Sequence, residues 1–213
     1  MKKTDDKDRK LTKAEQKRWD KFLQGKGEFE QNGYEMKEHT LGLVYANIMA
    51  FVVAIPIIVP FALLFYFVSE PVEIYEFPFV KLIVLAFLYI VSIVVHEALH
   101  GITWACFAKN HFKSIEFGVI WEMLTPYCTC SEVLKKWQYV LGSMMPLIVL
   151  GIVPCIIAVI SGNIYALAFG AIMVIAAGGD IIVTLRILRY KTDKNELVFY
   201  DHPTKCGFIT FER

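Results

Sequence analysis

The chain has 213 residues, 56% of them hydrophobic, and a mean hydropathy of +0.47, which predicts a protein that crosses a membrane several times. The formal net charge is +1, and 11 of the 22 Lys and Arg residues fall within the first 37 positions. Basic residues that flank apolar runs give no indication of a nucleic-acid partner. The five Cys residues do not form the framework of a disulfide-stabilised secreted protein.

We expect residues 1–42 to be a polar leader and not a cleavable signal peptide, because the first apolar run begins only near Leu43. Within the leader, the stretch Leu11 to Leu23 predicts a short amphipathic helix, since Thr12 followed by Glu15 fits a capping box. One face of this helix is apolar and carries Trp19, Phe22 and Leu23. We expect a cytoplasmic helix that lies on the membrane surface.

Four apolar runs are long enough to cross the bilayer as helices, at about residues 44–68, 79–107, 139–161 and 164–185. Prolines interrupt the first run at Pro56 and Pro60 and the third at Pro146 and Pro154, and membrane helices tolerate such kinks better than soluble ones. A tight turn at Gly162-Asn163 joins the third run to the fourth. The sequence therefore predicts an all-α polytopic membrane protein with four transmembrane helices.

The distribution of Lys and Arg predicts the orientation of these helices. The leader, the polar stretch 108–138 and the tail after Leu185 are basic, whereas the loop 69–78 and the turn 162–163 contain no Lys or Arg. The loop 69–78 carries Glu70, Glu73 and Glu76 instead. Since Lys and Arg favour the cytoplasmic side, both termini are expected there, in a multi-pass protein of a bacterial cell membrane.

The second predicted span contains the motif His96-Glu97-Ala98-Leu99-His100. Four residues advance about 400° around an α-helix, so His96 and His100 lie on one face, one turn apart. This spacing allows two imidazoles to hold one zinc ion, with Glu97 beside them to take a proton from a zinc-activated water. Ionisable side chains are unfavourable inside a membrane, which favours a functional role over a polar patch packed on a neighbouring helix.

A catalytic zinc site needs a third protein ligand, and depth in the bilayer points to Asp180. His96 lies about 25 Å along the second span and Asp180 about 24 Å along the fourth, and both spans run in the same direction. Gly178 and Gly179 precede Asp180 and favour a close approach of two helices. The alternative is that Asp180 pairs with Arg186 or with water.

The stretch 112–120 alternates apolar and polar residues at first and predicts a β-strand, half of a hairpin closed before Thr125-Pro126. Two roles stay open for it: its edge binds a substrate by strand addition, or the hairpin only covers the site. Cys128-Thr129-Cys130 with His111 has the wrong spacing for a structural zinc site, so reduced thiols are expected. His202 is expected in a turn.

These residues resemble the zincin peptidase family formerly described as a domain of unknown function, which is distantly similar to site-2 intramembrane metalloproteases. The similar pieces are His96-Glu97-Ala98-Leu99-His100, Thr125-Pro126-Tyr127-Cys128-Thr129-Cys130, the Pro146 and Pro154 pair, Gly179-Asp180-Ile181, Asp201-His202-Pro203 and Gly207-Phe208. The resemblance implies His96, His100 and Asp180 as zinc ligands and Glu97 as catalytic base. The Leu-Asp-Gly pattern that often supplies the third ligand in site-2 proteases is absent, and Asp180 is its nearest counterpart.

The predicted organisation is a leader (1–42), a four-helix membrane metallopeptidase-like domain (43–190) and a cytoplasmic tail (191–213). The favoured function is a zinc metalloprotease that cuts membrane-spanning proteins near the cytoplasmic face. One alternative is a non-catalytic zinc-binding membrane protein such as an adaptor, chaperone or sensor. Another is a small transporter or structural protein in which the motif is accidental.

Overall fold

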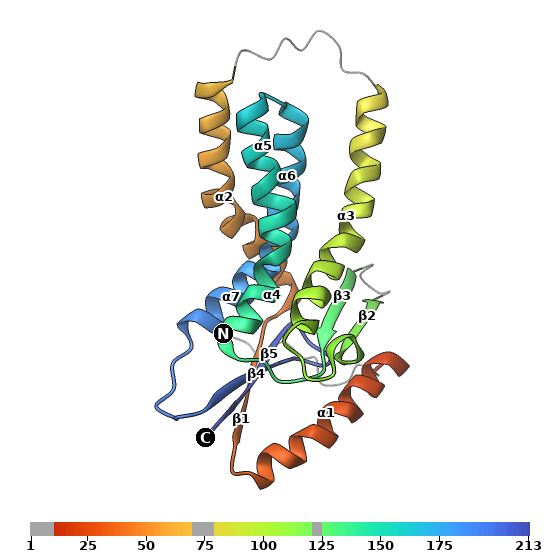
Figure 1. The fold of residues 1–213 in the computed structure, drawn as a ribbon, viewed down its shortest axis with the longest axis vertical. Helices are drawn as coiled ribbons and strands as arrows, with labels where there is room; N and C mark the ends of the chain where they lie inside the picture. Colours follow the sequence, from red (N-terminus) through yellow and green to blue (C-terminus); the bar gives the residue numbers. More distant parts are fainter. Residues whose placement is uncertain (1–10, 70–78, 121–124) are drawn as a thin grey trace.

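The computed structural model describes residues 11–69, 79–120 and 125–213 (Figure 1). Long helices make up one end of the molecule, and the leader helix, a β-hairpin and a small sheet make up the other. The predicted acidic loop with Glu70, Glu73 and Glu76 lies outside the described residues.

The helices follow the predicted apolar runs closely. The first two spans are the continuous helices α2 (Leu43–Val68) and α3 (Phe79–Ala105). The third comprises α4 (Lys136–Pro146), a π-helical stretch (Leu147–Ile152) and α5 (Val153–Ser161). The fourth is the pair α6 (Ile164–Ala176) and α7 (Gly178–Arg189), bent by 51°. Three of these units, and the bent pair if it counts as one span, are long and apolar enough to cross a membrane.

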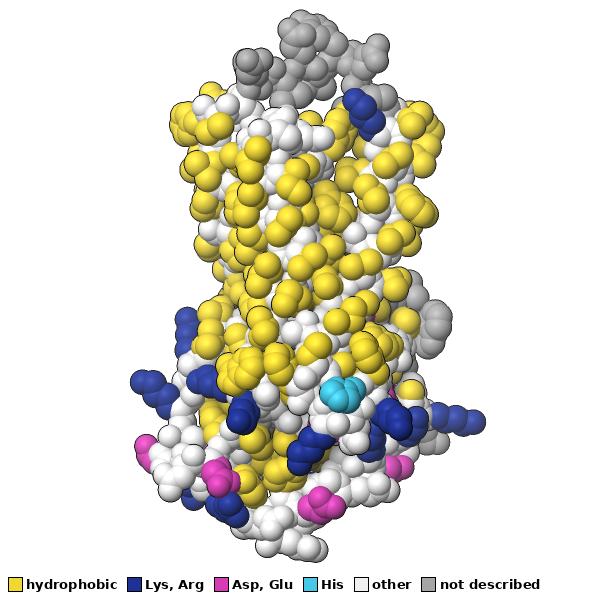
Figure 2. Space-filling view, viewed as in Figure 1, with side chains coloured by type: hydrophobic (Ala, Val, Ile, Leu, Met, Phe, Trp, Pro, Cys, Tyr) yellow, Lys and Arg dark blue, Asp and Glu magenta, His cyan; other side chains and the backbone are white. Residues whose placement is uncertain are grey.

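The distribution of hydrophobic side chains on the surface indicates a membrane protein. Hydrophobic side chains cover the long helical part of the molecule, and most charged side chains gather at the end formed by the leader, hairpin and tail (Figure 2). Large apolar residues along α2 and α3 are exposed in the isolated chain, among them Phe51, Phe67, Phe87 and Val94. Such a continuous apolar belt is stable only when lipid or protein covers it.

Close packing on α2 accompanies the break between α6 and α7. A Cβ atom added at Gly178 would lie 2.3 Å from Cβ and 2.5 Å from Cα of Ala50, so α7 packs directly on the backbone of α2. Only glycine permits this approach. At Gly179 the same atom would meet nothing within 4 Å. The two glycines were expected to bring Asp180 close to the histidines; the close contact that the structure shows is between Gly178 and α2, and Gly179 takes no part in it.

The predicted hairpin is present. Strands β2 (Ile115–Ile120) and β3 (Thr125–Cys130) pair antiparallel, with Phe117 opposite Cys128. A 3₁₀ turn, His111–Ser114, leads into β2 from the end of α3. A Cβ at Gly101 would lie 2.5 Å from the Phe117 ring, so the hairpin lies directly against α3 just beyond the HExxH motif.

A second sheet was not predicted, and the description of the chain as all-α needs this correction. Strands β1 (Glu35–Thr40), β5 (Gly207–Glu212) and β4 (Leu197–Asp201) form an antiparallel sheet in the order β1-β5-β4. The leader and the tail thus meet in one sheet. β5 lies in its centre with all six residues buried, so it lacks the polar alternation that identifies a half-exposed strand.

The leader helix α1 (Lys13–Gln31) begins with the predicted capping box between Thr12 and Glu15. The apolar face of this helix packs on the protein and is not exposed to a membrane surface, contrary to the prediction. Phe22 is buried against Tyr200 and Phe211 of the sheet, with ring centroids 5.2 and 6.3 Å away. The helix therefore covers the tail sheet, whereas Leu23 remains exposed.

Candidate metal centre

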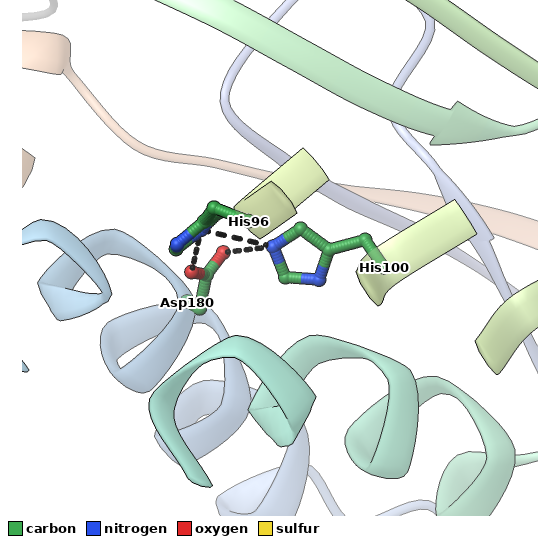
Figure 3. Close-up of side chains that lie close together, drawn as sticks. All are labelled: His96, His100 and Asp180. Atoms are coloured by element: carbon green, nitrogen blue, oxygen red, sulfur yellow. Dashed lines mark hydrogen bonds and ion pairs between the residues drawn. The ribbon is translucent and has the colours of Figure 1, made fainter. Parts of the chain in front are cut away.

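The structure brings together three side chains from two helices that are distant in sequence. His96 and His100 lie one turn apart on α3, and Asp180 faces them from the first turn of α7 (Figure 3). The two Nε2 atoms are 3.2 Å apart. Asp180 places Oδ2 3.1 Å from His96 Nε2 and Oδ1 3.5 Å from His100 Nε2.

This geometry fits a zinc ion. Ligands bound tetrahedrally at about 2.0–2.2 Å lie about 3.3–3.6 Å from one another, and the three observed separations run from 3.1 to 3.5 Å. Two imidazoles and one carboxylate also form a typical donor set for a catalytic zinc with an open position. In the described part of the chain, no other group of three His, Cys, Asp or Glu side chains has such geometry.

The alternative partner for Asp180 is engaged elsewhere. Arg186 donates from Nη1 to the carbonyl oxygen of Thr40 at 3.2 Å. Asp180 therefore faces the two histidines and not Arg186.

The orientation of His100 is fixed by a proline on another helix. His100 Nδ1 donates to the carbonyl oxygen of Gly142 at 2.8 Å, which leaves Nε2 as the unprotonated nitrogen that a metal requires. Gly142 O would normally accept the N–H four residues later, but Pro146 at that position has none. Pro146 thus frees the acceptor that His100 uses.

An aromatic stack supports the same histidine. The Trp104 ring lies on the His100 ring at a centroid distance of 5.2 Å and an interplanar angle of 15°. A Cβ at Gly142 would lie 2.1 Å from Trp104 Nε1, so only glycine lets α4 approach the indole so closely. Tyr139 also packs against Trp104 and is itself buried.

Glu97 lies beside the cluster, half-buried and held by the hairpin. Its carboxylate accepts the backbone N–H of Cys128 in β3. Because this N–H points toward α3, the edge of β3 that does not pair with β2 faces the candidate site. The hairpin therefore positions Glu97.

The three candidate ligands and Glu97 line a cavity of about 1060 Å³. One part of its wall is made of exposed apolar residues at the start of α2, Val44, Tyr45 and Ile48. Another part is polar and comes from the leader and the tail, including Arg18, Asp201 and Lys205. The cavity therefore joins the apolar belt to the charged end of the molecule.

Asp201 and Arg18 line this cavity but were not predicted as functional residues. Burial raises the pKa of the Asp201 carboxyl to about 7, although the Tyr139 hydroxyl, which donates to Oδ1 at 2.7 Å, opposes the shift. Its only sequence signal was its place in Asp201-His202-Pro203. Arg18 had no signal, because the pairing of leader with tail was not foreseen.

The remaining His and Cys residues lie outside the cluster. All five cysteines are free, and burial raises the pKa of Cys130 to about 12 and that of Cys128 further, so these thiols stay protonated at neutral pH. His202 accepts the N–H groups of Thr204 and Lys205 at Nδ1, as expected for a turn.

Comparison with known proteins agrees with this geometry. No curated protein and no solved structure matches the chain. A family model described as "putative zincin peptidase" matches residues 89–194, which include the HExxH motif, both histidines and Asp180. Over this segment the chain is therefore similar to the zincin peptidase family, as its motifs had predicted.

Proposed function

We propose that the protein is an intramembrane zinc metallopeptidase with His96, His100 and Asp180 as ligands. The observation that carries this proposal is the convergence of the three donor atoms at tetrahedral spacing, next to the carboxylate of Glu97. The match of residues 89–194 to the zincin peptidase family model supports metallopeptidase activity in general.

A zinc ion bound here would lower the pKa of a water molecule to about 7 and polarise a peptide carbonyl. Glu97 is then the general base: it accepts the proton of the attacking water and delivers it to the nitrogen of the leaving amine. The Cys128 N–H holds this carboxylate in place. Gly142 and Trp104 keep His100 in the tautomer and orientation that ligation requires.

The substrate is a membrane-spanning protein, cut near its cytoplasmic end. The apolar wall at Val44, Tyr45 and Ile48 gives the cavity a side that a lipid-embedded segment can reach. A helical substrate hides its peptide carbonyls in intrahelical hydrogen bonds, so it must unwind locally before cleavage. The polar part of the cavity gives the unwound backbone hydrogen-bonding partners.

Metal analysis of the detergent-purified protein tests the ligand set. The wild-type chain should contain one zinc per molecule, and Asp180→Ala should lose it, because a missing ligand weakens binding more than the about 10–100-fold caused by loss of a ligand's hydrogen-bond partner. Asp193→Ala, at an exposed position of the tail, is the matched control and should keep the metal. A metal-free wild type would contradict the proposal.

Cleavage tests the chemistry. In vesicles that also contain single-span model substrates, Glu97→Gln should retain zinc, and its cleavage rate should be lower than that of the wild type by a factor of about 10²–10⁴. Glu116→Gln, on the outer strand of the hairpin, should cleave normally. Zinc binding without any cleavage by the wild type would instead favour a non-catalytic zinc protein.

A further inference from the structure

Arg18 is a buried cation in the wall of the metal cavity. Only 7% of its surface is exposed, although it belongs to the leader helix, more than 70 residues before the HExxH motif. Buried arginines are normally paired with a carboxylate, because an uncompensated charge is costly away from water. Arg18 has no carboxylate within ion-pair distance in the part of the chain that the structure describes.

Its partners are neutral and fix the guanidinium in place. Nε donates to the carbonyl oxygen of Pro203 at 2.7 Å, and Nη1 donates to the hydroxyl of Tyr127. The guanidinium carbon also lies 4.2 Å from the centroid of the Tyr127 ring. Two of five N–H donors are thus satisfied, and Nη2 has no hydrogen-bond partner among the described residues.

The position of Arg18 relative to the metal centre follows from the tail. Asp201 lies within electrostatic reach of both Arg18 and His100, and all three line the same cavity. Asp201 does not neutralise Arg18: the two form no ion pair, and the Asp201 carboxyl bonds to Tyr139. The other cation of the wall, Lys205, is exposed. The guanidinium is therefore the one buried, preoriented cation that the described chain presents to this cavity.

We propose that Arg18 forms an anion-binding subsite that receives a carboxylate of the substrate. A carboxylate accepts two parallel N–H bonds from a guanidinium, which a neutral amide cannot match. The carboxylate belongs either to an acidic side chain or to the C-terminus of the peptide. Calling the ligand a substrate rests on the proposed peptidase function, but the subsite itself can be tested without catalysis.

The test uses the full-length Glu97→Gln chain in detergent, freed of metal by a chelator so that no cation at the histidines competes for the carboxylate. The probes are three N-dansyl octapeptides of Leu and Ala. One has an internal Gln and a C-terminal amide, one has Glu in place of Gln, and one has the Gln and a free C-terminal carboxylate. One of the two acidic peptides should bind about tenfold or more tightly than the neutral peptide, and its identity reveals the source of the carboxylate.

Arg18→Gln should reduce the favoured peptide to the affinity of the neutral one and leave the neutral peptide unchanged. Lys21→Gln is the matched control: Lys21 lies on the same helix and pairs with Glu116 of the same hairpin at 3.3 Å, but does not line the cavity. It should keep the full preference. If Arg18→Gln no longer binds even the neutral peptide, Arg18→Lys is used as the test instead. It keeps the positive charge and should still bind the acidic peptide more tightly than the neutral one, by a smaller factor.

Equal binding of all three peptides to the parent chain would overturn the proposal, as would a preference that survives Arg18→Gln. Arg18→Lys decides if Arg18→Gln does not fold. The proposal is then overturned if Arg18→Lys binds the neutral peptide normally but no longer binds the acidic peptide more tightly. A wild-type chain that binds these peptides but cleaves no substrate would overturn the peptidase function alone. The two proposals can therefore fail separately.

Discussion

At the scale of single residues, the candidate ligands depend on neighbours that do not touch the metal position. Pro146 is the clearest case. Its missing N–H leaves the Gly142 carbonyl free for His100 Nδ1, and the helix continues past it as a π-helical stretch from Leu147. The proline therefore acts on the candidate metal centre through another residue's backbone.

Pro146→Ala should weaken zinc binding while leaving the chain folded. The alanine N–H would compete with His100 for the Gly142 carbonyl, and loss of such a partner typically weakens metal affinity about 10–100-fold. A competition titration with a chelator measures the change. Pro154→Ala is the control, since the carbonyl four residues before it, that of Leu150, does not line the cavity. Equal zinc affinities in the two variants would contradict this role.

His202 should make the fold sensitive to acid. Burial, with a smaller contribution from nearby Lys205, lowers the pKa of His202 to about 4, although Glu38 opposes the shift. A proton added at Nδ1 would break the bonds from Thr204 and Lys205. The native chain therefore keeps this ring neutral at pH values where an unfolded histidine is charged.

The free energy of unfolding that His202 contributes is thus complete above about pH 6.5 and falls by up to about 3 kcal/mol as the pH drops to about 4. His202→Asn keeps an acceptor for the turn and cannot titrate. For metal-free protein unfolded in detergent, the wild type should lose stability relative to this variant across that window. Parallel pH profiles would disprove the effect.

Asp201→Asn provides a control of opposite sign. Burial raises the pKa of Asp201 to about 7, so the native chain binds its proton before the unfolded chain does. The stability from this proton is full below about pH 3.8 and is lost as the pH rises to about 7. Removing the carboxyl should therefore make the chain lose stability on acidification relative to the wild type.

Residue roles differ in how well the sequence reveals them. The spacing of His96, Glu97 and His100 is a side-chain pattern that helix geometry converts directly into a shared face. Asp180 could be inferred because depth in the bilayer restricts the candidates. The Gly142 acceptor is a backbone atom, which has no residue type of its own, and Arg18 reaches the cavity only through the folding of leader onto tail.

At the scale of elements, the contact between α2 and α7 places Asp180 opposite the histidines. Gly178→Ala should disturb it, because the added methyl would lie 2.3 Å from Cβ and 2.5 Å from Cα of Ala50. Overpacking of this kind costs about 1–3 kcal/mol. The variant should unfold at lower denaturant concentration in detergent and bind zinc more weakly.

Gly179→Ala is a closely matched control, one residue away in the same helix. Its added methyl meets nothing within 4 Å, and alanine favours helix over glycine by up to about 1 kcal/mol. It should be as stable as the wild type or more so. If both variants lost the same stability, the contact with Ala50 would not be the cause.

Hydropathy predicted the helices well because long apolar runs have few other stable structures in a bilayer. It did not predict the bend at Ala177, beside the point where Gly178 packs on α2. The β1-β5-β4 sheet was missed for a similar reason. Its strands are five or six residues long, and β1 and β5 pair across almost the whole chain, beyond the range of local patterns.

At the scale of the whole molecule, the sheet joins both ends of the chain at one end of the helices (Figure 1). The turn between α5 and α6 lies at the opposite end. The charged end in Figure 2 is the one that carries the leader and the tail. Because Lys and Arg favour the cytoplasmic side, this end is expected to face the cytoplasm, with the metal centre in the nearer half of the bilayer.

Cysteine labelling in cells tests this orientation. In a Cys106→Ser background, which removes the exposed native cysteine, Ser161→Cys marks the end of α5 and Lys194→Cys marks the tail, both at exposed positions. A membrane-impermeant maleimide should label Ser161→Cys in intact cells and reach Lys194→Cys only after permeabilisation. The reverse pattern would place the leader, the tail and the nearby cavity outside the cell. Labelling of both sites in intact cells would mean that they lie on one side of the membrane, which a single crossing by the fourth span between them cannot produce.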